Sequence, residues 1–143
     1  MDQLQISARF PHIDPAHLVE FKGVAAELVA LARAEPGTLH YALFLNADET
    51  VGVIREVYVD SNAVLAHLAG SGAVLGRLIA LGGGVQIECF GAPSPALIAA
   101  SAALAPTVYT LMDSKQGPCC MAVPWFPRAE LRGRARVRAK LAA

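Results

Sequence analysis

The sequence lacks the features that would assign it to a class at once. Its apolar stretches are interrupted by Arg77, Glu88, glycines and prolines, well short of the roughly 20 apolar residues that a membrane span needs. Residues 1–3 lack the basic and apolar regions of a secretory signal. We therefore expect a cytoplasmic protein with no membrane partner.

Signatures of cofactors and metals are missing as well. No G-x-G-x-x-G motif follows a predicted strand, and the glycines at 82–84 lack the Lys-Ser/Thr of a phosphate-binding loop. Cys119 and Cys120 are adjacent and have no second Cys/His pair at zinc spacing, so neither a bridge nor a metal is expected there. Cys89 lies in an apolar strand pattern and is predicted to be a core residue. We expect no cofactor and no metal.

The chain has no net charge, with 12 basic and 12 acidic residues, but its charges are unevenly distributed. Residues 128–143 contain several arginines, one lysine and a single glutamate. We interpret this segment as a solvated helix that docks on the chain's own acidic body or on a partner subunit. The alternative is an arm for nucleic acid or an anionic surface. No aromatic residues lie between these charges, as a single-strand binder would need, so nucleic acid is not an expected partner.

Alternation and helical spacing predict the order β-α-β-β-α-β, the ferredoxin-like arrangement. The predicted strands are 4–10, 39–45, 51–59 and 85–90, and the predicted helices are 15–34 and 61–81, the second broken at 70–72. Beyond them we predict a helix at 96–104, a fifth strand at 107–112, a linker and a basic helix. The expected domains are a ferredoxin-like domain at 1–92, a helix–strand extension at 93–112, and the linker with the basic helix at 113–143.

The composition indicates a partner subunit. Hydrophobic residues make up 55% of a chain of only 143 residues, and the second and third strands carry apolar residues on both faces. A sheet that is apolar on both faces is buried on both, whereas the helices of this fold cover one face only. A second copy paired across a two-fold axis would cover the other face, so we expect a homodimer.

Two residues are candidates for acid–base chemistry. His67 lies in the second helix with Val64 and Leu68 at neighbouring helical spacings, and histidine is a suitable base near neutral pH. Glu56 interrupts an apolar strand, where burial raises the pKa of a carboxyl group. As an alternative, His67 is a core histidine paired with a backbone carbonyl or with Glu56. Glu56 in turn is paired with the neighbours of Arg55, or with Arg9 or Arg77.

Three further residues are candidates for substrate binding. Tyr41 and Tyr58 offer rings that stack on an aromatic compound and hydroxyls that bind its oxygen; the alternative is that both are ordinary core residues of the sheet. Arg9 interrupts the first strand and is suited to bind an anionic group or to form a salt bridge at the edge of the barrel.

The chain resembles the antibiotic biosynthesis monooxygenase (ABM) family over roughly residues 4–90. The resemblance rests on Glu35-Pro36-Gly37 followed by the strand tyrosine Tyr41, on Glu56-x-Tyr58, and on a helix that carries His67. It implies a dimeric α/β barrel and a cofactor-independent monooxygenase of small aromatic or quinol-type compounds. The pocket would lie between sheet and helices, with His67 as base or proton relay, Glu56 as its partner, and Tyr41 and Tyr58 facing the substrate.

The sequence departs from the family in one helix. Relatives commonly carry Ser-x-His and an aromatic residue just after the helix histidine, where this chain has 70–73 as Gly-Ser-Gly-Ala. Many relatives also have tryptophan where this chain has Tyr58. These departures favour the alternative function, a non-catalytic dimeric α/β-barrel protein that binds a small molecule.

Overall fold

The structure is a computed structural model that describes residues 3–114. Met1–Met112 forms a unit of its own, which contains both the predicted 1–92 domain and the predicted 93–112 extension. The predicted basic helix and the pair Cys119 and Cys120 lie outside the described residues.

The order of the elements confirms the ferredoxin-like prediction. The β-α-β-β-α-β unit consists of β1 (Leu4–Phe10), α1 (Leu18–Ala34), β2 (Thr38–Leu45), β3 (Gly52–Tyr58), α2 (Ser61–Leu81) and β4 (Gln86–Phe90). A short 3-10 turn, η1 (Pro15–His17), precedes α1. The extension consists of α3 (Pro95–Ser101), the 3-10 turn η2 (Ala102–Leu104) and β5 (Thr107–Tyr109).

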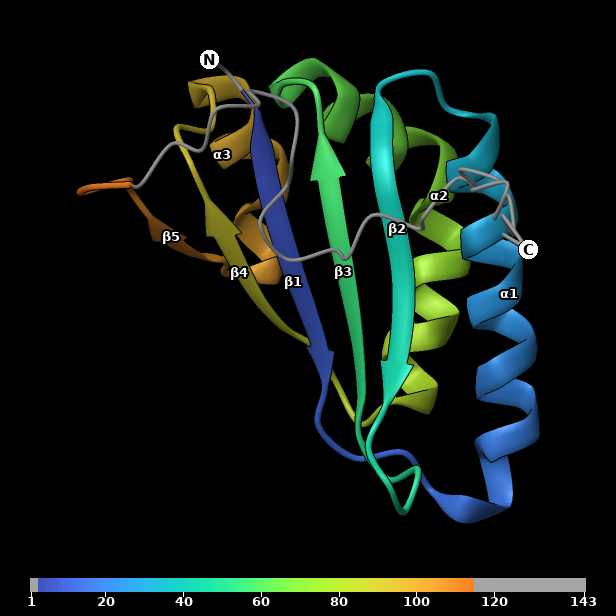
Figure 1. Ribbon diagram of the computed structural model, residues 1–143. Coiled ribbons are helices and arrows are strands. Elements are labelled where there is room, and N and C mark those ends of the chain that lie inside the picture. Colours follow the sequence, from blue (N-terminus) through green and yellow to red (C-terminus); the bar gives the residue numbers. More distant parts are fainter. Residues whose placement is uncertain (1–2, 115–143) are drawn as a thin grey trace, which may run out of the picture. The chain divides into compact units, whose positions relative to one another are not determined.

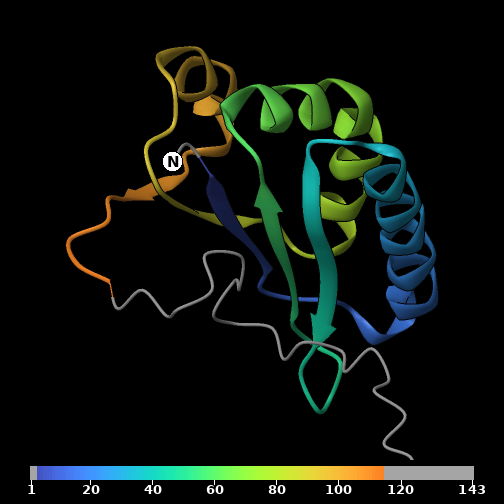
Figure 2. The ribbon, with the colours of Figure 1, turned by 45° about the horizontal axis from the view of Figure 1, so that its top comes forward.

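The five strands form one sheet in the order β2-β3-β1-β4-β5. β4 and β5 are parallel, whereas the other neighbours are antiparallel. The helices α1, α2 and α3 all lie on the same side of the sheet (Figures 1 and 2). The main core between sheet and helices is built around buried Phe10, Phe21, Leu28, Ile54 and Leu78. The fold is therefore the predicted α+β class, with one face of the sheet left open by these helices.

Side chains of Asp14, Asp60 and Ser94 cap the starts of η1, α2 and α3. The Asp14 carboxylate accepts a hydrogen bond from the Ala16 amide, and Asp60 accepts one from the Ala63 amide. The Ser94 hydroxyl accepts one from Leu97 at the start of α3. Each cap gives a partner to an amide that the first turn leaves unpaired.

The second helix differs from the prediction, because α2 is continuous through Gly70 and Gly72. Its buried residues Val64, His67, Ser71 and Leu78 recur at spacings of three, four and seven, so packing favours one helix across both halves. The Ser71 hydroxyl also donates to the His67 carbonyl across the predicted break. Glycine lowers helix propensity by only about 1 kcal/mol per residue, and the packed face outweighs that cost.

The helix α2 also changes one prediction about membranes. By length and composition alone it is apolar enough to cross a bilayer, and it is the one such helix within residues 3–114. The prediction that no segment resembles a membrane span is therefore wrong on that criterion. In this structure α2 packs against α1 and the sheet, and helices that pack on a core meet the same criterion.

Candidate functional site

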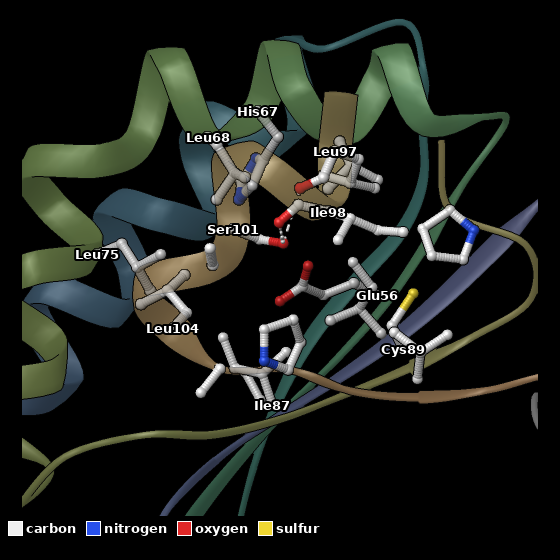
Figure 3. A pocket seen from close by; sticks show the side chains of 18 residues that line it. Glu56, His67, Leu68, Leu75, Ile87, Cys89, Leu97, Ile98, Ser101 and Leu104 are labelled. Atoms are coloured by element: carbon white, nitrogen blue, oxygen red, sulfur yellow. Dashed lines mark hydrogen bonds between the residues drawn. The ribbon is translucent and has the colours of Figure 1, made fainter. Parts of the chain in front are cut away.

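A cavity of about 290 Å³ lies between the sheet and the helices. Its floor comes from β1, β3 and β4, and its other walls come from α2, α3, η2 and β5 (Figure 3). Most of its 18 lining residues are apolar; the ionisable or hydroxyl-bearing ones are Glu56, His67, Ser101 and Cys89. An apolar cavity with a few polar groups is the usual form of a small-molecule site.

Glu56 projects from β3 into this cavity (Figure 3). It is 8% exposed, and its Oε2 accepts a hydrogen bond of 2.7 Å from the Tyr58 hydroxyl. Burial raises the pKa of Glu56 to about 7; the Tyr58 hydrogen bond opposes the rise and the nearby Glu35 charge adds to it. A carboxyl group that titrates near neutral pH can both take and return a proton under working conditions.

His67 reaches the cavity from α2 on the opposite side (Figure 3). Its Nδ1 lies 2.9 and 3.0 Å from the two carboxylate oxygens of Glu35, and the ring is only 2% exposed. A carboxylate accepts hydrogen bonds and cannot donate them, so Nδ1 donates to Glu35. The expected carboxylate partner of His67 was Glu56; the hydrogen-bonded carboxylate is Glu35 instead, and Glu56 is bound by Tyr58.

The turn after α1 brings Glu35 to His67. Glu35 is the C-cap residue of α1, and its Oε2 also accepts a 2.6 Å hydrogen bond from the Thr38 hydroxyl. Two residues later, a Cβ on Gly37 would lie 2.5 Å from the Cβ of Ala63 in α2. Glycine at 37 therefore allows the turn to approach α2 closely enough for the Glu35–His67 contact.

The two tyrosines contact the histidine ring rather than the cavity. The Tyr41 ring centroid lies 5.2 Å from that of His67, and the Tyr58 centroid lies 5.6 Å from it. Burial, followed by the charge of Glu56, raises the pKa of both hydroxyls, so both stay protonated. Neither tyrosine is among the residues that line the cavity. Their placement in van der Waals range of His67 makes them supports of the imidazole.

Arg9 lies away from this site. It is exposed and donates to Gln86 on the open face of the sheet, whereas its neighbour Ala8 lines the cavity. Alternate residues of a strand point to opposite faces, so the expected binding of substrate by Arg9 in the cavity of His67 and Glu56 is not supported. Neither Arg9 nor Arg77 pairs with Glu56; Arg77 is bonded to Glu27.

Sequence reasoning missed two parts of the site. Glu35 was recognised only as part of the Glu35-Pro36-Gly37 motif and was given no role in the site, although a carboxylate directly before Pro-Gly was the available signal. The residues Leu97, Ser101 and Leu104 form a wall of the cavity, and their spacing of four and three was the signal for that role. Within residues 3–114 no group of three or more His, Cys, Asp or Glu residues is arranged to hold a metal ion.

Comparison with known proteins shows which family this sequence is similar to. Residues 6–73 match the family model described as antibiotic biosynthesis monooxygenase, a range that includes Glu35, Glu56 and His67. None of the curated proteins matches the sequence.

Among solved structures, MupZ from Pseudomonas fluorescens is 25% identical with a TM-score of 0.71, and the match covers 82% of this chain and 97% of MupZ. SnoaB from Streptomyces nogalater, a cofactor-independent oxygenase, is 25% identical with a TM-score of 0.52, and covers 66% and 96%. Rv0793 from Mycobacterium tuberculosis, at 23% identity, a TM-score of 0.54 and coverage of 66% and 99%, supports the fold alone. The larger share matched by MupZ exceeds the segment up to Phe90, so that likeness extends beyond β4.

Proposed function

We propose that this protein is a cofactor-independent monooxygenase of a small aromatic or quinol-type compound, because residues 6–73 match the family model described as antibiotic biosynthesis monooxygenase. The observation that carries the proposal is the convergence of Glu56 and His67 on one apolar cavity. The likeness to SnoaB, a cofactor-independent oxygenase, supports the type of reaction.

The chemistry requires the removal of a proton. A phenolate or enolate can transfer an electron to O2, whereas the neutral compound does so poorly. In the proposed reaction Glu56 or His67 takes a proton from the substrate, and the resulting anion reduces O2. The substrate supplies all four electrons: the CH2 group of an anthrone, for example, becomes C=O with one oxygen atom, and its two hydrogens leave with the other oxygen atom as water. The dry surroundings keep the pKa of Glu56 at about 7, where a carboxylate is a stronger base than in water.

Oxygen uptake tests this proposal directly. A panel of quinols and anthrones is incubated with the protein while dissolved O2 is recorded. We expect uptake with at least one compound, a loss of about 100-fold or more in His67→Ala or Glu56→Gln, and no change in Arg9→Gln, which alters only the open face. Undiminished uptake in both cavity variants would remove the proposed roles of these residues.

A second candidate function is a non-catalytic small-molecule-binding protein. It is favoured by the helix after His67, where Gly70 and Gly72 are exposed and carry no side chain, so a second imidazole is missing at that point. Saturable binding of a quinol or anthrone without oxygen uptake would support the binder over the enzyme.

We also propose that two copies pair through the open face of the sheet. Phe44 is 51% exposed there, and it lies beside half-buried Val53 on the neighbouring strand. Sedimentation velocity at micromolar concentration should show a dimer, and Phe44→Glu should convert it to single chains. A wild-type protein that sediments as one chain would contradict this.

A further inference from the structure

We propose that the cavity selects ligands that donate a hydrogen bond, such as a phenol, enol or alcohol on an apolar body, and rejects ligands that only accept one. This inference concerns the polarity of the site and rests on the proposed function only in using the same cavity. It follows from the hydrogen bonds that the lining side chains already make, because a hydrogen in such a bond cannot also be donated to a ligand.

At the floor, the carboxylate of Glu56 offers an acceptor. Its Oε2 is occupied by the Tyr58 hydroxyl, which spends its hydrogen in that bond. Its Oε1 has no hydrogen-bond partner among residues 3–114. This oxygen is nevertheless not fully buried, so part of its surface is accessible. Oε1 is therefore open to the cavity, into which the side chain points (Figure 3).

At the opposite wall, His67 offers a second acceptor. Because Nδ1 donates its hydrogen to Glu35, Nε2 carries a lone pair and no hydrogen whenever the ring is neutral. Within the described residues, Nε2 likewise has no hydrogen-bond partner and is not fully buried. Glu35, which binds the other nitrogen, does not line the cavity. The free nitrogen thus faces the space that the ligand would fill. Glu35 is a positioning residue, since it fixes which nitrogen holds the hydrogen.

At the wall formed by α3, Ser101 adds no free donor. Its hydroxyl donates to the Leu97 carbonyl at 2.8 Å, within the same helix (Figure 3). Among the side chains that line the cavity, the one remaining polar hydrogen belongs to the Cys89 thiol, a weak donor. No lysine or arginine of the described chain lines the cavity. A buried acceptor that meets no donor loses its hydrogen bond to water without replacement, which costs about 1–3 kcal/mol.

The space admits an aromatic ligand of this kind. An apolar cavity of about 150 Å³ is enough to hold benzene, so a cavity of about 290 Å³ has room for two fused rings. We therefore choose 2-naphthol and its methyl ether, 2-methoxynaphthalene, as probes. They share the ring system and differ in that the ether has no hydrogen to donate.

Calorimetry of the full chain at about pH 8, above the pKa of Glu56, provides the test. We expect 2-naphthol to bind at least about 10-fold more tightly than its ether, since a site that pairs with a hydroxyl discriminates against the analogue without it. Apolar burial alone would favour the ether, which carries an extra methyl group. Equal or tighter binding of the ether, or no binding of either probe, would overturn the inference.

The isosteric variant Glu56→Gln sharpens the test. With the Tyr58 hydroxyl held by its oxygen, the new amide presents an NH2 donor to the cavity, so the preference for 2-naphthol should shrink at least severalfold. Glu27→Gln, on the exposed side of α1, is the matched control and should leave the preference unchanged. A preference that survives in Glu56→Gln would contradict the role of that carboxylate.

The tautomer of His67 gives a readout independent of any ligand. Long-range ¹H–¹⁵N spectra of histidine-labelled protein should show the hydrogen of the neutral ring on Nδ1, and Glu35→Gln, which can donate or accept, should produce a mixture of tautomers. A hydrogen on Nε2 in the wild type would place a donor in the cavity and overturn the inference. Oxygen uptake without a preference for 2-naphthol would contradict this inference and leave the proposed function supported. A preference for 2-naphthol without oxygen uptake would support this inference and contradict the proposed function.

Discussion

Two tyrosine–glutamate pairs lie on opposite faces of the sheet and show how burial changes the same contact. Under the helices, the Tyr58 hydroxyl donates to Glu56 at 2.7 Å, and both residues are buried. On the open face, Tyr109 donates to Glu88 at 3.3 Å and is 44% exposed. Burial under the helices raises the pKa of Glu56 to about 7. The same two residue types thus occur on both faces, and the helices that cover Glu56 are what bury its carboxyl group and raise its pKa.

The largest expected difference between the two faces is in packing. Phe10→Ala on the covered face removes a side chain that is 0% exposed and should lower the free energy of unfolding by about 3–5 kcal/mol. Phe44→Ala on the open face should lower it by less than about 1 kcal/mol in single chains. Urea denaturation of both variants measures this. Equal losses in single chains would break the comparison.

The second-largest expected effect is the contribution of Glu56, on the covered face, to the pH dependence of the free energy of unfolding. The pKa of Glu56 rises from 4.5 to about 7 on folding, so the folded protein binds more protons than the unfolded chain between these values. The free energy of unfolding should therefore be greatest below about pH 4.5 for this group and fall by about 3 kcal/mol as the pH rises through 7.

The variant Glu56→Gln isolates this contribution. Subtracting its denaturation curve from that of the wild type, pH by pH, removes the other titrating groups. Glu88→Gln, which removes a carboxyl group on the open face of the sheet, is the matched control. A slope that persists in Glu56→Gln would show that another group is responsible.

The hydroxyl groups of the two pairs should differ by a smaller amount. Tyr58→Phe removes a hydrogen bond to a buried carboxylate and should cost about 1.5–3 kcal/mol at about pH 8, where Glu56 is ionised. The same change should raise the pKa of Glu56, since that bond lowers it, and ¹³C spectra of the glutamate carboxyl groups can follow the titration. Tyr109→Phe should change the stability by no more than about 0.5 kcal/mol.

The smallest effect concerns the helix that covers the site. Because α2 is continuous and a Cβ on Gly72 would meet nothing within 4 Å, Gly72→Ala should raise the free energy of unfolding by about 0.5–1 kcal/mol. Gly37→Ala, whose Cβ would meet Ala63, should lower it instead. Destabilisation by Gly72→Ala would indicate that the helix is broken where the sequence first suggested.

The predicted fold was confirmed because local signals agree with one another along this chain. Asp14 with Pro15, Asp60 and Ser94 each mark a helix start by cap chemistry, and the glycines at 82–84 end α2. The break predicted at Gly70 and Gly72 was wrong because propensity is a weak term beside the packing of Val64, His67 and Leu78 on the sheet.

Less of the candidate site was accessible to sequence reasoning. His67 and Glu56 were recognisable because an ionisable residue in an apolar pattern must find a partner, but the partner of each was not. Glu35 is 32 positions from His67, and only the close approach of the turn at Gly37 to α2 brings the two together. Arg9, like Glu56, interrupts an apolar strand and was a candidate for substrate binding, but its side chain lies on the opposite face of the sheet, where it is bonded to Gln86.

By itself, the sequence determined the order of strands and helices, the caps that begin the helices, and which residues had to be paired if buried, because these depend on neighbours within a few positions. The tertiary structure alone decided that Glu35 holds His67, that Tyr58 holds Glu56, and that α3 closes a cavity over both. Those outcomes depend on distances between segments far apart in the chain, and on the removal of water that only the assembled layers achieve.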